Sequence, residues 1–175
     1  VVLEDKHMGS RAIAVVCRNA DVSRDRFGVV NGQTGTIYTR TGRPFFSDYD
    51  MTDALLERIR VGIDGSGLWD DLKTDWLLLD AELMPWSAKA QDLIRQQYAA
   101  TGSAARAGLT TATALFAQAE ARGLETGHAS IRFAERAKRT ELFAQAYRQY
   151  CWPVGSLDDY RFAPFHLLAS EGAVH

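Results

Sequence analysis

Lys6-His7-Met8-Gly9-Ser10-Arg11, near the start of the chain, predicts a turn between two strands. Residues 1–4 and 10–18 on either side alternate or run apolar, which predicts two strands joined by a turn. Gly9 permits that turn to be tight. The turn brings Arg11 near Lys6, and a nearby cation lowers the pKa of a lysine, leaving a neutral amine that can attack an electrophile. The alternative is an ordinary surface turn.

The rest of the first half of the chain predicts further strands and one helix. Asn31-Gly32, between Phe27–Val30 and Thr34–Thr39, is a strong hairpin signal. Residues 51–63 have apolar side chains at helical spacing, with Asp50 or Thr52 as the N-cap and residues 64–67 as the end. The apolar run 76–79 predicts a buried strand.

The second half of the chain has a different pattern of apolar residues. Residues 87–150 contain three apolar stripes punctuated by glycines, which predicts about three helices and no strand. Residues 160–169 are again strand-like. We therefore expect an α+β fold with three parts: a β-rich core over 1–86, a helical insertion over 87–153, and a return to the core over 154–175.

Composition points to a soluble globular protein, because 46% of the 175 residues are hydrophobic and 24% are charged. No apolar run is long enough to cross a membrane. The two cysteines, Cys17 and Cys151, match no metal-binding spacing, so we expect packing residues in a reducing cytoplasm. The first residues already predict a strand, so we expect the chain to be part of something longer.

Charge is unevenly distributed along the chain. Residues 1–47 carry seven Lys/Arg against four Asp/Glu, and residues 48–82 carry three against ten. A basic first segment suits a phosphate-rich ligand, although ordinary surface charge would give the same counts. Nucleic acid remains a possible partner at a pI near 6.1, because a cleft can be basic while the remaining surface is not.

Three more segments carry candidate site residues. Arg40 and Arg43 flank a glycine turn that can clamp a phosphate or can be a solvated turn. Asp80 and Glu82 lie on one side of a strand, where one of them can bind a ribose hydroxyl or a divalent metal, or where both simply face solvent. Phe165 can stack on a base or belong to the core.

In this order and spacing, these segments resemble the covalent nucleotidyltransferases: DNA ligases, RNA ligases and mRNA capping enzymes. The family pattern K-x-D/H/N-G-x-R is similar to Lys6–Arg11, S-R-x-G to Thr39–Gly42, D-G-E to Asp80–Glu82, and F-D-h-L to Phe165–Leu168. Where the sequence departs from these family patterns, it resembles the ligase domain of bacterial polynucleotide kinase-phosphatase. The resemblance is strongest in Glu82-Leu83-Met84-Pro85-Trp86-Ser87-Ala88-Lys89-Ala90. The helical module between the third and fourth motifs is also similar to that family.

The resemblance implies an ATP-grasp-like nucleotidyltransferase fold, incomplete at its C-terminus, and a role for each matching residue. Lys6 would be the nucleophile that takes AMP from ATP, and Glu4 would lie by the adenine edge. Arg11 would contact the ribose, Arg40 would lie near the phosphate, Glu82 would bind the ribose or a metal-bound water, and Phe165 would stack on the adenine.

The resemblance also implies a wider setting. The reaction would join RNA 5′-phosphate and 3′-hydroxyl ends with ATP and a divalent cation, Mg²⁺ or Mn²⁺. Kinase and phosphatase domains would lie in the same parent chain, and an RNA 3′-end methyltransferase would be a partner. The lysines that grip the ATP phosphates in such domains would follow His175.

Two other readings stay open from the sequence. One is a DNA ligase or a capping-type nucleotidyltransferase from the same superfamily. The other is a non-catalytic module that docks RNA or a protein partner through its helices.

Overall fold

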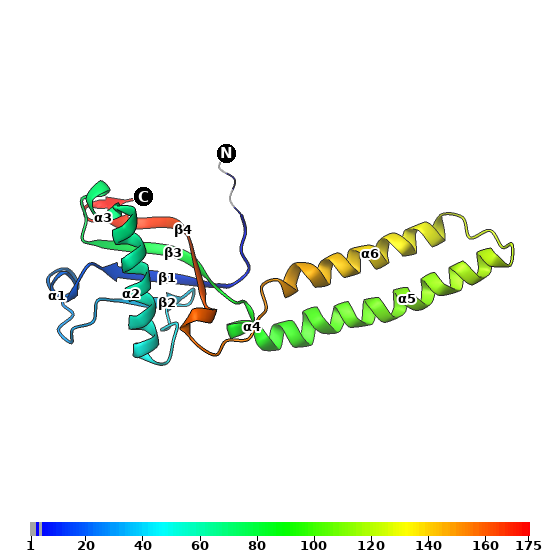
Figure 1. The fold of residues 1–175 in the computed structure, drawn as a ribbon, viewed down its shortest axis with the longest axis horizontal. Coiled ribbons are helices and arrows are strands. Elements are labelled where there is room, and N and C mark those ends of the chain that lie inside the picture. The colour runs from blue at the N-terminus through cyan, green and yellow to red at the C-terminus, as the bar shows by residue number, and fades with distance from the viewer. Residues whose placement is uncertain (1–2, 4) are drawn as a thin grey trace. The chain divides into compact units, whose positions relative to one another are not determined.

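The computed structural model describes Leu3 and Asp5–His175. The chain divides into two compact units (Figure 1): one comprises the residues up to Pro85 together with Pro153–His175, and the other comprises Trp86–Trp152. Helices and an antiparallel sheet make up the structure, which confirms the expected α+β class. No helix in the described residues is long and apolar enough to cross a membrane.

The first unit is built on a five-stranded antiparallel sheet in the order β2-β1-β3-β4-β5. Its strands are β1 (Ser10–Cys17), β2 (Gly35–Thr39), β3 (Trp76–Met84), β4 (Arg161–Ser170) and β5 (Ala173–Val174). The strands predicted over 10–18, 34–39 and 160–169 are confirmed, and the strand predicted over 76–79 continues to Met84. Most of the strand predicted over 1–4 falls outside the described residues.

The predicted hairpin around Asn31-Gly32 is wrong. The segment before it forms helix α1 (Ala20–Phe27), and β2 pairs with β1 instead, from Ala12 opposite Thr39 to Val16 opposite Gly35. Strong caps explain the helix: the Asn19 side chain accepts a hydrogen bond from the Val22 N–H at 3.0 Å, and Gly28 closes the last turn at φ 70°.

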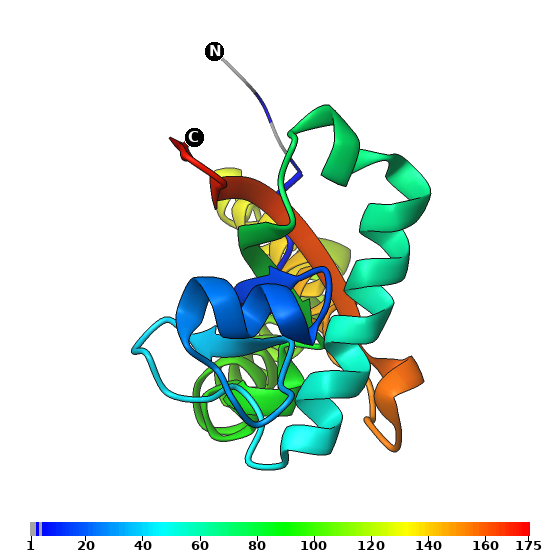
Figure 2. The ribbon, with the colours of Figure 1, turned by 90° about the vertical axis from the view of Figure 1, so that its left-hand side faces the viewer.

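Helix α2 (Tyr49–Ser66) packs against one face of the sheet (Figures 1 and 2) and confirms the predicted helix. Its N-cap is Asp48, which accepts from the Asp50 N–H at 3.0 Å, and not Asp50 or Thr52. The left-handed Gly67 (φ 74°) ends it, and the short α3 (Leu68–Asp71) follows. The buried core includes Leu55, Leu56, Ile59 and Ile63 of α2, together with Phe45 and Trp69, against Ala12, Ala14, Val16, Ile37, Leu77, Leu79 and Leu83 of the strands.

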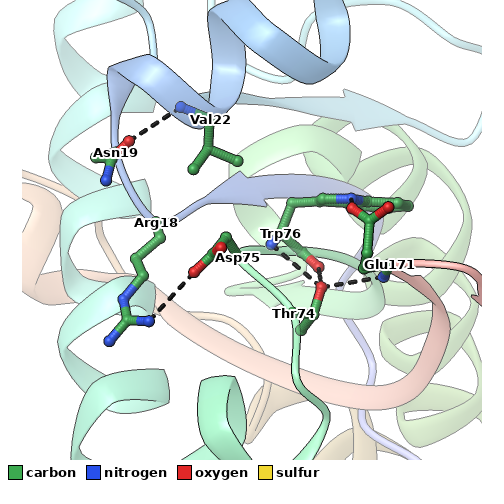
Figure 3. Close-up of polar contacts among 7 residues, drawn as sticks. All are labelled: Arg18, Asn19, Val22, Thr74, Asp75, Trp76 and Glu171. Carbon is green, nitrogen blue, oxygen red and sulfur yellow. Dashed lines mark hydrogen bonds and ion pairs between the residues drawn. The ribbon is translucent and has the colours of Figure 1, made fainter.

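Polar contacts fix the sheet at the end where β3 begins (Figure 3). The buried Thr74 hydroxyl donates to the Trp76 carbonyl at 2.7 Å and accepts from the Glu171 N–H at 3.0 Å. The Trp76 indole N–H donates to the Glu171 carboxylate at 2.8 Å, and Arg18 pairs with Asp75 at 3.2 Å. These contacts join the ends of β1, β3 and β4.

The second unit contains three α-helices and a π-helical turn, which confirms the prediction of about three helices and no strand over 87–150. Helix α4 (Ser87–Leu93), which is kinked at Ala90 (φ −111°, ψ 25°), is followed by a π-helical turn (Ile94–Ala99) and α5 (Ala100–Ala121), and α6 (His128–Arg148) packs beside α5. Gly102 does not interrupt α5, because it is buried under the Phe143 ring. The chain reverses at Gly123 (φ 80°), beyond α5. A glycine inside a helix costs only about 1 kcal/mol relative to alanine, so packing outweighs it.

Candidate functional site

A pocket of about 630 Å³ lies where β3 ends and β4 begins. It is lined by Asp5, Lys6, His7, Glu82, Ala163, Pro164 and Phe165. The structure therefore brings together three of the residues that the sequence singled out: Lys6, Glu82 and Phe165. The chain contains four lysines, all described in the structure, and Lys6 is the one that lines this pocket.

Gly9 places the Lys6 segment against the end of β3. A Cβ atom on Gly9 would lie 2.7 Å from the Leu83 carbonyl oxygen and 3.2 Å from Glu82 Oε2, so no other residue fits without displacing the strand. Close approach of two backbones, and not a left-handed turn, is the reason for glycine here.

Glu82 is the carboxylate that β3 contributes to the pocket. The Gly9 N–H donates a hydrogen bond to its carboxylate, and Lys6 and Arg11 contribute positive charge. Burial and the neighbouring Asp80 charge nevertheless raise the pKa of Glu82 above its ordinary value. Its Oε2 atom is buried and has no hydrogen-bond partner among the described residues. A buried acceptor without a donor is costly, so Oε2 fits a donor that a ligand brings, such as a ribose hydroxyl.

Asp80, the other carboxylate of the strand, is occupied by Arg11. The Arg11 Nε donates to Asp80 Oδ1 at 2.9 Å and Nη2 donates to Oδ2. The register puts Arg11 directly opposite Glu82 and Ile13 opposite Asp80, so Asp80 is the diagonal neighbour of Arg11 on the sheet face away from α2, within reach of its long side chain. The hydrogen bond and charge of Asp80 raise the pKa of Arg11. Of the two acids that the sequence offered as ligands, Glu82 is the one that lines the pocket.

Phe165 reaches the pocket because β4 is irregular. The pairing steps from Asp80 opposite His166 to Ala81 opposite Pro164, which leaves Phe165 in a bulge. A bulge turns a side chain away from the regular alternation of a strand, and Pro164 beside it has no N–H for the ladder. The Phe165 ring is 44% exposed, so an aromatic face is open to a ligand.

The remaining predicted site residues lie elsewhere. Arg40 follows β2 in an exposed turn, where Gly42 (φ 78°) donates to the Thr39 carbonyl at 2.9 Å. That turn is at the same end of the sheet as Arg11, but Arg40 does not line the pocket. Glu4 lies outside the described residues.

Sequence reasoning missed Asp5 and His7, which line the pocket on either side of Lys6. Their position next to Lys6 was the available signal. The sequence also left open a metal site at Asp80 and Glu82. Within the described part of the chain, no group of three or more His, Cys, Asp or Glu side chains could hold a metal ion.

Comparison with known proteins adds to this geometry. No curated protein sequence matches the chain. Among solved structures, a chain of the Pnkp1/Rnl/Hen1 complex is similar with a TM-score of 0.51 and 17% identity over 98% of this chain and 48% of that one. A chain of the Pnkp1/Rnl/Hen1 RNA repair complex is similar with a TM-score of 0.50 and 16% identity, over 94% of this chain and 46% of that one. This chain thus spans about half the length of those chains and shares their fold.

The family comparison covers the entire sequence. A model of the PNKP adenylyltransferase domain, ligase domain, matches residues 1–175. That match includes the segments that form the pocket, from Lys6 through Glu82 to Phe165. The chain therefore belongs to the family of PNKP adenylyltransferase (ligase) domains.

Proposed function

We propose that this chain is the adenylyltransferase part of an ATP-dependent RNA ligase with a nucleotidyltransferase fold. The observation that carries the proposal is the pocket that Lys6 and Glu82 line together, since no described residue donates a hydrogen bond to the buried Oε2 of Glu82. Family membership supports it, because the family is one of adenylyltransferase ligase domains.

ATP fits the side chains that line this pocket. The volume of about 630 Å³ is within the range of roughly 300–1,000 Å³ of small-ligand sites. In the proposal the Phe165 ring stacks on the adenine, Glu82 accepts a ribose hydroxyl at Oε2, and Arg11 contacts the ribose while Asp80 holds it in place. Arg40 lies near the phosphates, and Glu4 near the adenine edge.

The proposed reaction begins when Lys6 gives up a proton to solvent water and its neutral Nζ attacks the α-phosphorus of ATP. A phosphorus–nitrogen bond forms, the bond to the bridging oxygen breaks, and pyrophosphate leaves with that electron pair. The AMP then passes to the 5′-phosphate of RNA, and a 3′-hydroxyl displaces it. Mg²⁺ or Mn²⁺ bound with ATP would offset the negative charge of the phosphates.

The wider setting is also a proposal. The similar solved chains come from a Pnkp1/Rnl/Hen1 RNA repair complex, which favours RNA as the substrate. On the same ground we propose an RNA 3′-end methyltransferase as a partner, and kinase and phosphatase domains in the parent chain.

Incubation of the intact protein with α-labelled ATP tests the first step. We expect the label to stay on the protein through a denaturing gel. Lys6→Arg should abolish labelling because the guanidinium keeps the charge but is not a nucleophile at neutral pH. Lys138→Arg, the same change on an exposed helix, should leave labelling unchanged.

The outcomes separate the alternatives. Labelling by GTP and not ATP would indicate a capping-type enzyme, and joining of DNA ends in preference to RNA ends would indicate a DNA ligase. A protein that binds RNA but acquires no label under any condition would contradict catalysis and favour a docking module.

A further inference from the structure

The helical unit has a charge opposite to the remaining chain. Trp86–Trp152 carries nine Lys/Arg against five Asp/Glu, whereas the other residues carry eleven against seventeen. A concentration of positive charge on one unit of an acidic chain favours an anionic partner for that unit.

A groove of about 360 Å³ runs along one side of the α5–α6 pair. Gly102, Ala105 and Leu109 of α5 and Phe143 of α6 give it an apolar base, and Arg136 and Arg139 line it from α6. These two arginines are three residues apart, which places their side chains next to each other on the helix surface.

The charges on this groove are weakly compensated. Arg139 faces Glu135 at 3.7 Å with both side chains largely exposed, and Arg136 lies 5.8 Å from the Phe133 ring centroid. By contrast, Arg106 makes two hydrogen bonds to Glu141, at 2.7 and 2.8 Å. Among the described residues, no carboxylate pairs with Arg136, so this side of the helical unit keeps positive charge for a ligand.

Phe143 is held as a rigid ring in the same groove. It stacks on Tyr98 at a centroid distance of 5.8 Å and an interplanar angle of 8°, and Tyr147 meets it edge-on at 5.5 Å. It is nevertheless 38% exposed. Gly102 beneath it carries no side chain; a Cβ there would lie 3.7 Å from the ring. Proteins that bind single-stranded nucleic acids combine an exposed, immobilised aromatic ring with neighbouring positive charge in this way.

We propose that the groove between α5 and α6 binds a single-stranded segment of RNA, with Arg136 and Arg139 on successive phosphates and Phe143 against a base. The choice of RNA rests on the proposed function, whose substrate is RNA. An acidic peptide would use the arginines but would leave the aromatic ring without a planar partner, so the ring favours a nucleotide.

Salt-dependent binding tests this assignment. The probe is a short 5′-phosphorylated, fluorescently labelled oligoribonucleotide, and its anisotropy with the intact protein is followed as KCl is raised. Each phosphate contact on a single strand contributes about 0.7 to the slope of log K against log salt. Arg136→Gln with Arg139→Gln should reduce that slope by about 1.4 and weaken binding at least roughly tenfold. Phe143→Leu should weaken binding with an unchanged slope.

The matched control is Lys138→Gln with Arg148→Gln, which removes the same charge from exposed positions of α6 that do not line the groove. An equal loss in the control pair would show diffuse attraction and overturn the proposal. If the groove variants bind RNA as tightly as the wild type, the proposal is also overturned. This holds even if the same variants lose binding to a protein partner. Formation of the Lys6 adduct with ATP needs no RNA. A failure of that labelling would contradict the proposed function and would leave the anisotropy measurement of RNA binding unaffected.

Discussion

The nearly buried carboxylate of Asp80 holds the half-exposed guanidinium of Arg11 through two hydrogen bonds, one from Nε to Oδ1 and one from Nη2 to Oδ2. The two residues come from neighbouring strands, β1 and β3, and Asp80 itself does not line the pocket that contains Lys6. Asp80 therefore serves to orient Arg11, and in the proposed reaction Arg11 is the group that meets the nucleotide.

Asp80→Asn removes the charge and one acceptor from that pair while preserving the shape of the side chain. We expect slower formation of the AMP adduct, by up to about 100-fold, because small misplacements of a positioning group have effects of that order. The measurement is the single-turnover labelling rate against ATP concentration. Asp80→Glu, which restores the charge, should recover part of the rate.

The control for this change is Asp75→Asn, at the other end of the same sheet. Asp75 pairs with Arg18 at 3.2 Å, and both side chains are about half exposed, so the pair contributes little. Equal rates in the Asp80 and Asp75 variants would remove the argument that Arg11 needs its partner.

Glu82 should give the protein a distinctive dependence of stability on pH. Its folded pKa lies above its ordinary value of 4.5, so the native state binds more protons than the unfolded state between those two values. The contribution of Glu82 to the free energy of unfolding is therefore fully present below the ordinary pKa and is lost as the pH rises through the raised pKa. Glu82→Gln removes this titration.

Urea unfolding of wild-type protein and the Glu82→Gln variant between about pH 4 and 7 isolates this contribution. The stability of the wild type relative to the variant should decrease with rising pH and then level off. A difference that stays constant, or that grows with pH, would mean that burial does not govern this carboxylate.

Gly9 is the glycine next to the Lys6 segment where a single methyl group should have a large effect. In Gly9→Ala the new Cβ would lie 2.7 Å from the Leu83 carbonyl oxygen, so the Lys6 segment must move away from β3. Overpacking of this kind costs about 1–3 kcal/mol of unfolding free energy. Movement of Lys6 should also abolish formation of the AMP adduct.

Gly108→Ala is the matched substitution inside α5, where a Cβ atom meets nothing within 4 Å. It should stabilise the helix by up to about 1 kcal/mol and leave labelling intact. If both alanine variants keep full stability and labelling, the close approach at Gly9 has no functional role.

Local pattern was sufficient for much of the fold, but not for choosing between the two acids of β3. The period of a strand puts Asp80 and Glu82 on one side, and the sequence predicts this. Which acid pairs with Arg11 depends on the register of β1 against β3, a contact between residues 69 apart in the chain. No local periodicity carries that information.

The same limit explains the misread segment before β2. Asn31-Gly32 is a strong turn signal, yet α1 forms just before it because Asn19 and Gly28 cap a polar helix that has no clear apolar stripe. The caps were visible in the sequence. What was not visible is that β2 pairs with β1, which leaves residues 27–30 without a strand partner.

The bulge at Phe165 leaves its aromatic ring available for recognition of the base. If the exposed ring stacks on adenine, Phe165→Ala should weaken binding of adenosine by about 1–3 kcal/mol, because stacking contributes that much per base. Adenosine is the suitable probe, since it lacks the phosphates that Lys6 and the arginines would contact.

Phe27→Ala is the control: Phe27 is similarly exposed, at 47%, but packs edge-on against Trp76 at the other end of the sheet. Calorimetric titration of both variants should show the loss in Phe165→Ala alone. An equal affinity in the two would mean that the bulge directs Phe165 toward packing and that adenine is held by other groups of the pocket.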